Sequence, residues 1–316
     1  MDQPKISIII PAYNEESCIG DCIKGILSQD YGNKEVIVVN DGSTDRTGEI
    51  AKIFGVKVID FKENRGLGVA RNMAVRQSSG EILYFLDADV LIKQKDFLSK
   101  IAEDLEDDTI DAVVFKVALE KPATFMQKCL SLSHLQVHYG VEKKILCGEP
   151  EESKVRGFWV IRKKVFQELG WFNEKAFFFE DRYLQNKFYS TGHKALYDPR
   201  LVMYDIRPEN WSEFMRQSRW IGIGLYRYYR QTGIMYYRAI LFWLVYATSG
   251  LTSLLFLKPR LLFLFMNILL LVWILKTAYK TRSLTPSVGY VFLHAIRTFT
   301  VFYYFVRLFL SREKAK

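Results

Sequence analysis

The first 115 residues alternate short, continuous apolar runs with segments of helical pattern, and this rhythm restricts the fold more than any other feature. The apolar runs predict strands at Ile6–Ile10, Glu35–Val39, Val56–Phe61 and Ile82–Leu86. Helices are expected between them, over about residues 17–28, 45–54 and 68–77. Strands that are apolar on both faces and joined by helices form a parallel sheet covered on both sides. The N-terminal part is therefore expected to be an α/β domain with a doubly wound sheet.

Polar residues follow three of these strands at the point where each strand ends. They are Tyr13–Glu15 after the first strand, Asp41–Ser43 after the second and Asp87–Asp89 after the fourth. Parallel strands end at the same edge of a sheet, and ligands bind outside their carboxyl ends. These residues are therefore expected to line one site.

Asp87 and Asp89 are the strongest chemical signal in the sequence. Two carboxylates that are two residues apart and leave a strand together can both turn toward one hard cation, Mg²⁺ or Mn²⁺. Such a cation would neutralise charge on a departing nucleoside diphosphate. A solvated turn has the same appearance, so the spacing alone leaves both interpretations open.

The chain carries a net charge of +9, which suits either a nucleic-acid binder or a protein on an anionic membrane surface. Many basic residues, such as Arg216, Arg227 and Arg238, lie beside apolar aromatic segments, and no basic run resembles a nucleic-acid tail. Membrane lipids, and no nucleic acid, are therefore the expected partners.

The four cysteines contain no Cys-x-x-Cys pair, so a reducing compartment is expected rather than a disulfide framework. The N-terminus leads directly into the first strand without the pattern of a signal peptide. These two observations predict that the N-terminal domain faces the cytoplasm.

The C-terminal third differs from the rest in its apolar character. Trp211–Arg238 is rich in Trp, Tyr and Arg, as segments at membrane interfaces are. Ala239–Leu257 carries no charge and approaches the roughly 20 residues that cross a bilayer, and Leu261–Leu275 is also uncharged. We expect three regions: a cytosolic domain over residues 1–210, an interfacial segment over 211–238, and C-terminal membrane helices over 239–316.

The last apolar segment, about residues 286–310, has one polar stripe. Arg297, Thr300, Tyr304 and Arg307 recur at steps of three and four residues, which places them on one face of a helix. The helix could lie on a surface, or span a membrane with its stripe facing protein.

Four motifs together resemble the family 2 glycosyltransferases. They are Ser7–Glu16, Val38–Asp45, Asn64–Gly66 with Ala70–Asn72, and Phe85–Asp89, in the order and approximate spacing of the family. Weaker similarity continues to about residue 220. The resemblance implies a GT-A fold, a nucleotide-diphosphate sugar donor and inversion at the anomeric carbon.

By this resemblance, the nucleotide would lie against Pro11, Tyr13, Glu15, Asp41, Arg71 and Asp87. Asp41 would accept a hydrogen bond from the base, and Arg71 would lie near the base or the phosphates. Asp87 would lie near the ribose and the metal, with Asp89 as the more direct metal ligand.

In the family, a Glu-Asp pair placed as Glu180-Asp181 supplies the catalytic base. Asp181 would take the proton from an acceptor hydroxyl, and Glu180 would support it. The preceding Phe177–Phe179 would desolvate a carboxylate and raise its pKa, which makes a better base. Acidic residues also favour the first turn of a helix, and an ionised lipid phosphate as acceptor would need no base.

Gln217-Ser218-Arg219-Trp220 is similar to the Gln-x-x-Arg-Trp motif of processive members but is one residue short. Arg219 could hold the leaving diphosphate, and Trp220 could stack on an acceptor sugar. An interfacial helix with Arg and Trp at the lipid headgroups would explain the same residues. The shortened motif argues against processive synthesis.

The sequence thus predicts an inverting glycosyltransferase that is anchored in the cell membrane. It would move one sugar from a nucleotide-diphosphate sugar, with UDP favoured and GDP possible, to a polyprenyl- or dolichyl-linked acceptor. The alternatives are a processive polysaccharide synthase and a catalytically silent nucleotide-sugar-binding membrane protein. A sugar nucleotidyltransferase is disfavoured because Pro11–Asn14 stands where such enzymes carry a glycine-rich loop.

Overall fold

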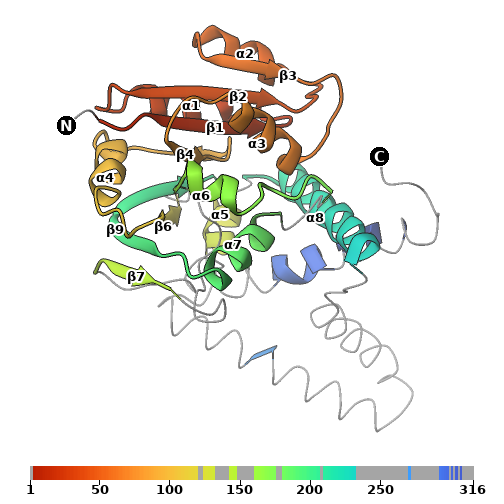
Figure 1. Cartoon of the computed structure of the whole chain (residues 1–316). Coiled ribbons are helices and arrows are strands. Elements are labelled where there is room, and N and C mark those ends of the chain that lie inside the picture. The colour runs from red at the N-terminus through yellow and green to blue at the C-terminus, as the bar shows by residue number, and fades with distance from the viewer. Residues whose placement is uncertain are drawn as a thin grey trace, which may run out of the picture. The chain divides into compact units, whose positions relative to one another are not determined.

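The computed structural model in Figure 1 describes residues 3–119, 124–131, 142–147, 160–175, 180–206 and 209–232, with short pieces at 270–271, 292–298, 300–301, 303–304 and 307. Two units make up the chain. The first comprises Met1–Glu120 with Val137–Ile206, and the second comprises Lys121–Gln136 with Arg207–Lys316. The predicted borders at residues 210 and 238 stay predictions.

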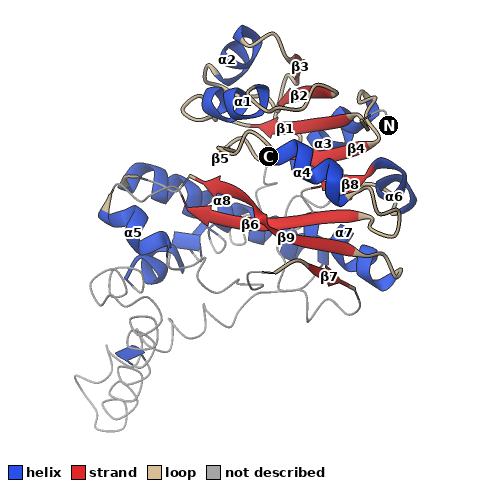
Figure 2. Cartoon of the chain, turned by 90° about the vertical axis from the view of Figure 1, so that its left-hand side faces the viewer, coloured by secondary structure: helices blue, strands red, loops and turns tan. Residues whose placement is uncertain are grey.

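The first unit is built on a mixed sheet, which has nine strands in the described part of the chain, in the order β3-β2-β1-β4-β8-β6-β9-β5 with β7 also paired to β9. The strands are β1 Ile6–Ala12, β2 Lys34–Asn40, β3 Lys57–Asp60, β4 Ile82–Phe85, β5 Val90–Leu91, β6 Ala112–Leu119, β7 Lys144–Leu146, β8 Val160–Arg162 and β9 Ala195–Asp205. Strands β1 to β4 are mutually parallel, as predicted, whereas β8 pairs antiparallel with β4 and β6. Figure 2 shows these strands in red.

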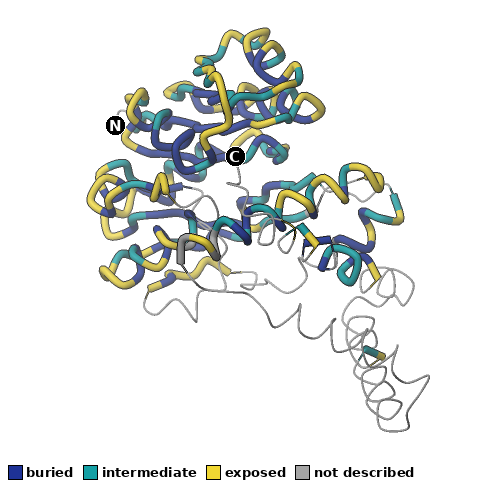
Figure 3. The backbone as a smooth tube through the Cα atoms, turned by 90° about the vertical axis from the view of Figure 1, so that its right-hand side faces the viewer, coloured by how far each residue is buried: buried dark blue, intermediate teal, exposed yellow. Residues whose placement is uncertain are grey.

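Helices cover both faces of this sheet. They are α1 Ile19–Leu27, α2 Thr47–Ile53, α3 Leu67–Arg76, α4 Phe97–Asp104, α6 Lys163–Glu168 and α7 Glu180–Ser190. Ile8 and Ile10 of β1 pack with α1 and α4, whereas Ile9 packs with α3, α6 and α7. Side chains alternate across a strand, so a continuous apolar run fills two cores. Figure 3 shows the buried residues in the middle of this unit in dark blue. The predicted α/β fold is confirmed.

Strand β1 continues through Pro11, where the sequence predicted its end. Asp41 donates its N–H to the carbonyl of Ala12, and Leu86 donates to the carbonyl of Ile9, so alternate residues of β1 face β2 and β4. Pro11 therefore faces the side on which β4 has already ended at Phe85. Its missing N–H costs no ladder hydrogen bond there, which is why a proline is tolerated.

Strand β9 is anchored by a buried charge network. Asp198 and Asp104 both lie inside, Arg200 binds Asp198 through two of its nitrogens, and Lys143 reaches both carboxyl groups. Burial raises the pKa of Asp104 to about 6, against the opposing hydrogen bond from Lys143, and the charge of Asp198 raises it further. The pKa of Asp198 is lowered, because the hydrogen bonds from Arg200 outweigh its burial. Of the two carboxyl groups, Asp104 therefore keeps its proton to the higher pH.

The second unit contains α5 Phe125–Ser131 and α8 Trp211–Thr232. The predicted polar stripe faces α8: Arg297 donates to Gln217 at 2.7 Å, and the Arg219 guanidinium lies 5.3 Å from the centre of the Tyr304 ring. A Cβ at Gly222 would lie 2.8 Å from the carbonyl oxygen of Val301, so this glycine permits the close approach. Of the two alternatives for the stripe, the described residues favour contact with protein.

None of the described helices is both long and apolar enough to cross a membrane. Ala239–Leu257 and nearly all of Leu261–Leu275 lie outside the described residues. The predicted membrane helices therefore stay a prediction.

Gly80 provides the first test of the packing. Its N–H donates to Ser7 Oγ at 2.9 Å, and an added Cβ would lie 2.6 Å from the carbonyl oxygen of Lys5 and 2.8 Å from the nitrogen of Ser7. Because these are backbone atoms of a central strand, Gly80→Ala should lower the free energy of unfolding by about 3 kcal/mol in denaturant titrations. Gly32→Ala, which meets no atom within 4 Å, is the control and should change it by less than about 1 kcal/mol. Equal effects of the two variants would contradict the packing described.

Asp104 provides a test by pH. Because its folded pKa of about 6 lies above the ordinary value of about 3.9, the folded state holds this proton more tightly, and stability falls as pH rises from 4 to 6. Asp104→Asn should remove this decrease in the free energy of unfolding, which is on the order of 2 kcal/mol across that pH range. Thermal or urea unfolding measured at each pH checks it. Asp108→Asn, whose carboxylate is fully exposed, should keep the decrease.

Candidate functional site

The candidate site lies at the carboxyl ends of β1, β2 and β4, where the sequence placed it. There the loops after β1 and β2 are tied together by side chains. Asn14 adopts a left-handed conformation with φ of 58°, its backbone N–H donates to Ser43 Oγ at 3.0 Å, and its side-chain Oδ1 accepts from the Thr44 N–H at 2.8 Å. Beside it, Tyr13 leaves 40% of its surface exposed, whereas Pro11 is buried in β1. Tyr13 is thus available to a ligand.

Asp41 holds the loop that precedes α3. Its two carboxylate oxygens accept the backbone N–H groups of Arg65 at 2.7 Å and Gly66 at 2.9 Å. Burial raises its pKa, although these hydrogen bonds oppose the rise. Gly42 has φ of 70°, and a Cβ there would lie 2.5 Å from the nitrogen of Asn64, so a glycine is required beside the loop. The contact between Asp41 and a base stays a prediction.

Asp89 lies among other carboxylates. Its pKa is well above the ordinary range because of burial first, and then because of the charges of Asp205, Asp87 and Glu15. Asp205 is distant from Asp89 in the sequence: it ends β9 and faces Val90 across the antiparallel β5–β9 pair. Asp205 was not among the predicted site residues, because no local sequence pattern indicates this strand pairing.

This excess of negative charge is the feature that fits a divalent cation, which would favour the ionised form of Asp89. Within the described residues, no group of three or more His, Cys, Asp or Glu side chains is arranged to hold a metal ion. Asp87 and Asp89 would thus leave most of the coordination sphere to water and substrate, as Mg²⁺ sites with phosphate ligands do.

Arg71 joins the two acidic motifs of the site. Only 5% of it is exposed, and its terminal nitrogens donate to Asp87 Oδ1 at 2.9 Å and to Glu180 Oε1 at 2.6 Å. Its guanidinium also lies 5.3 Å from the centre of the Phe172 ring. The sequence predicted Arg71 near the base or phosphates, and the structure places it between two carboxylates.

Glu180 and Asp181 begin α7, and they differ in burial. Glu180 is 5% exposed, and burial raises its pKa, against the lowering effect of the Arg71 charge. Asp181 is only partly buried, so it is the more accessible of the two. Phe177–Phe179 lie outside the described residues, and the base role of Asp181 stays a prediction.

Arg219 and Trp220 belong to α8 of the second unit. Trp220 leaves 43% of its surface exposed, and Arg219 stacks on Tyr304. Their predicted roles toward diphosphate and acceptor sugar stay predictions.

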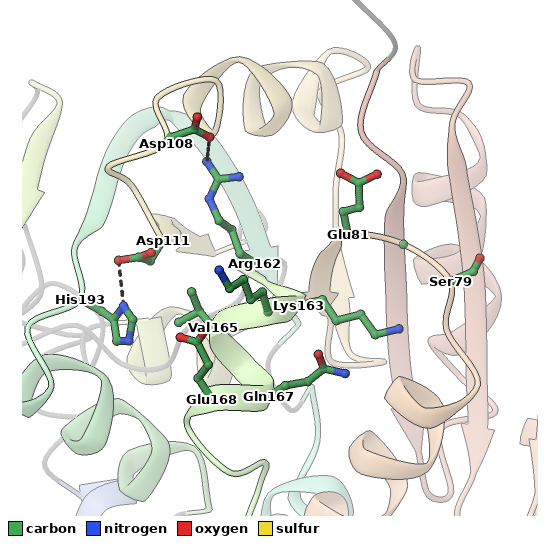
Figure 4. Close-up of a pocket in the computed structure, with 12 residues that line it drawn as sticks. Ser79, Glu81, Asp108, Asp111, Arg162, Lys163, Val165, Gln167, Glu168 and His193 are labelled. Atoms are coloured by element: carbon green, nitrogen blue, oxygen red, sulfur yellow. Dashed lines mark hydrogen bonds and ion pairs between the residues drawn. The ribbon is translucent and has the colours of Figure 1, made fainter.

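A hollow of about 650 Å³ lies at the opposite edge of the sheet, where residues 79–81 precede β4 and His193 precedes β9 (Figure 4). Several of its charged groups serve the fold: His193 Nδ1 lies 3.0 Å from Asp111 Oδ2, and Lys163 donates to the carbonyl of Ser78 at 2.7 Å. This hollow is separate from the predicted site residues. Its charged groups are paired within the protein, which indicates a polar contact region between strands.

Comparisons with known proteins agree with the geometry. Residues 7–170, just over half of the chain, match the model of "Glycosyl transferase family 2". The glycosyltransferase GlyA of Streptococcus pneumoniae is 31% identical over 218 residues, which is 64% of this chain and 31% of that protein. The poly-beta-1,6-N-acetyl-D-glucosamine synthase of Staphylococcus epidermidis is 26% identical over 68% of this chain and 53% of its own length. The chain thus spans about a third to a half of these curated relatives.

Two solved structures share the fold. Residues 1–349 of TarS from S. aureus superimpose with a TM-score of 0.53 at 24% identity, covering 70% of this chain and 65% of that one. The mannosyltransferase PcManGT from Pyrobaculum calidifontis, in complex with GDP-Man and Mn²⁺, superimposes with a TM-score of 0.58 at 20% identity, covering 94% and 87%. At these identities the likeness concerns the fold, and it confirms the predicted GT-A-like architecture.

Asp41 provides a test of the site's framework. Asp41→Asn would turn an amide donor toward one of two backbone N–H groups, leaving that group unsatisfied, so the free energy of unfolding should fall by about 1–3 kcal/mol. Amide hydrogen exchange at Arg65 and Gly66 should accelerate together with this loss. Asp60→Asn, at an exposed carboxylate nearby, serves as the control, and slow exchange in Asp41→Asn would refute the anchoring role.

Proposed function

This chain belongs to glycosyl transferase family 2, and we propose that it transfers one sugar from a nucleotide-diphosphate sugar to a membrane acceptor with inversion at the anomeric carbon. The family match and the site support this proposal together. The observation that carries it is the link between Asp87, at the end of β4, and Glu180, at the start of α7, through Arg71. This link brings the acids expected on the donor side and on the acceptor side into one site.

The donor would lie over the carboxyl ends of β1 and β2. Tyr13 is exposed there, and Asp41 holds the loop that would border the base. A UDP-sugar is our first choice and a GDP-sugar the second, since TarS was solved with UDP-GlcNAc and PcManGT with GDP-Man. Both proteins resemble this chain in fold.

A divalent cation, Mg²⁺ or Mn²⁺, would be held by Asp89 and Asp87. When bound, it would offset the charge that develops on the leaving diphosphate. The charges of Asp205 and Glu15, which disfavour ionisation of Asp89, support this assignment. The Mn²⁺ in the PcManGT complex is a further argument from a protein of the same fold.

Asp181 would take the proton from an acceptor hydroxyl. Glu180 would keep the first turn of α7 in place through its pair with Arg71. A lipid phosphate acceptor is already ionised, so Asp181 would be dispensable for it.

The acceptor would be a polyprenyl- or dolichyl-linked lipid at the cell membrane, with the catalytic unit facing the cytoplasm. The uncharged segments Ala239–Leu257 and Leu261–Leu275 favour this choice. On α8, Trp211 and Trp220 are exposed together with Arg216, a combination suited to lipid headgroups.

A processive synthase is the second candidate. The similarity to the poly-beta-1,6-N-acetyl-D-glucosamine synthase favours it, and the shortened motif ending in Trp220 argues against it. Product length distinguishes the two: a single added sugar supports transfer, and long chains from one acceptor support polymerisation.

The test uses detergent-solubilised full-length protein with UDP- and GDP-sugars, Mn²⁺ or Mg²⁺, and polyprenyl phosphate or hydroxyl glycolipid acceptors. We expect transfer that EDTA abolishes, and a loss on the order of 100-fold in kcat/KM for Asp89→Asn. Asp181→Asn should lower kcat about 10²- to 10⁴-fold with a hydroxyl acceptor and leave transfer to a phosphate acceptor nearly intact. Asp96→Asn, at an exposed acid paired with Lys100, is the control.

Failure of every donor to bind or turn over would overturn the transferase assignment. Donor binding without any transfer would instead support the catalytically silent alternative.

A further inference from the structure

Arg71 connects three elements, of which α7 is distant in the sequence. It belongs to α3, Asp87 follows β4, and Glu180 opens α7 more than 100 positions later. Both acceptor oxygens are within 2.9 Å of its terminal nitrogens, and its side chain is 6% exposed. Without this cation, Asp87 and the buried Glu180 would face each other uncompensated, and unpaired buried charge is strongly unfavourable.

The surroundings of Arg71 restrain it from a second side. Asn72, the next residue of α3, donates to the carbonyl of Phe172 at 2.9 Å and accepts the N–H of Phe172 at 3.1 Å. The Phe172 ring then lies beneath the Arg71 guanidinium. One turn of α3 therefore holds both Glu180 and Phe172.

These contacts distinguish Arg71 from a residue that binds phosphate directly. Each terminal nitrogen already donates to a carboxylate, the side chain is almost completely buried, and Nε meets no acceptor among the described residues. A guanidinium so enclosed acts on substrates through the groups that it holds. The group nearest to the expected chemistry is Asp181, which shares the first turn of α7 with Glu180.

We infer that Arg71 is a positioning residue, which fixes Glu180 and with it the orientation of Asp181 relative to the donor-side carboxylate Asp87. The inference rests on the proposed function. It assigns to Arg71 an effect on the transfer step, in place of the contact with base or phosphates that the sequence suggested.

A double-mutant cycle on the full-length protein tests this role. Arg71→Met and Glu180→Gln should each lower kcat on the order of 100-fold, as expected when a reacting group is misplaced by about 1 Å. The double variant should be no slower than Arg71→Met alone, because residues that act through one contact are not additive. The Kd of the donor nucleotide, measured by calorimetry in the presence of Mn²⁺, should change by less than about 5-fold in all three variants.

Arg76→Met is the matched control. Arg76 lies on the same helix, pairs with Glu174 and stacks on Trp171, yet it is half exposed. It should change kcat by less than about 2-fold, as surface pairs contribute little.

A direct role of Arg71 at the phosphates would give a different pattern. The donor Kd would rise by at least 10-fold in Arg71→Met, and the kcat losses of the two single variants would multiply in the double variant. Either result overturns the inference. If Arg71→Met does not fold, as judged by thermal unfolding, the same cycle is measured with Arg71→Lys, which keeps a charge but cannot bind both carboxylates in Arg geometry.

The wild type separates this inference from the proposed function. If the wild-type protein transfers sugar but the effects of the two substitutions on kcat are additive, the positioning role is refuted and the enzyme assignment stands. A wild type that binds no donor removes both.

Discussion

The side chains of Arg71 and Glu180 are almost completely buried, whereas that of Asp87 is 34% exposed. Removing a buried ion from water costs several kcal/mol, and only close pairing offsets that cost. The three groups meet this condition at 2.6 and 2.9 Å, in a place where one cation stands between two anions. Such an arrangement adds little net stability compared with apolar packing, but it tolerates few alternative geometries. It therefore fixes the relative positions of α3, the end of β4 and the start of α7.

Around Asp89, by contrast, negative charge is in excess. Asp89 lies among the charges of Asp205, Asp87 and Glu15, which raise its pKa together with burial. The two carboxylates therefore differ in environment: Asp87 has Arg71 as its counter-ion, whereas Asp89 lies among other acidic groups.

The parts that could be predicted from the sequence depend on local order. Continuous apolar runs predicted β1 to β4, and the polar residues after them predicted the edge of the sheet that carries Asp41, Asp87 and Asp89. The parts that were missed depend on contacts between distant segments. Neither the Arg71 pair with Glu180 nor the approach of Asp205 to Asp89 has a periodicity or spacing of its own. The run of β1 through Pro11 was likewise hidden, because it depends on where the neighbouring strand β4 ends.

The division of labour between Glu180 and Asp181 follows from the same geometry. Consecutive residues of a helix point about 100° apart, so Glu180 and Asp181 direct their carboxylates differently. Glu180 is directed to Arg71 and is almost completely buried, so an acceptor hydroxyl cannot reach its carboxylate. Asp181 keeps part of its surface exposed on another side of the turn. A catalytic base has to reach the proton that it removes, so this difference in accessibility supports the proposed base role of Asp181, with Glu180 as the group that would hold the turn in place.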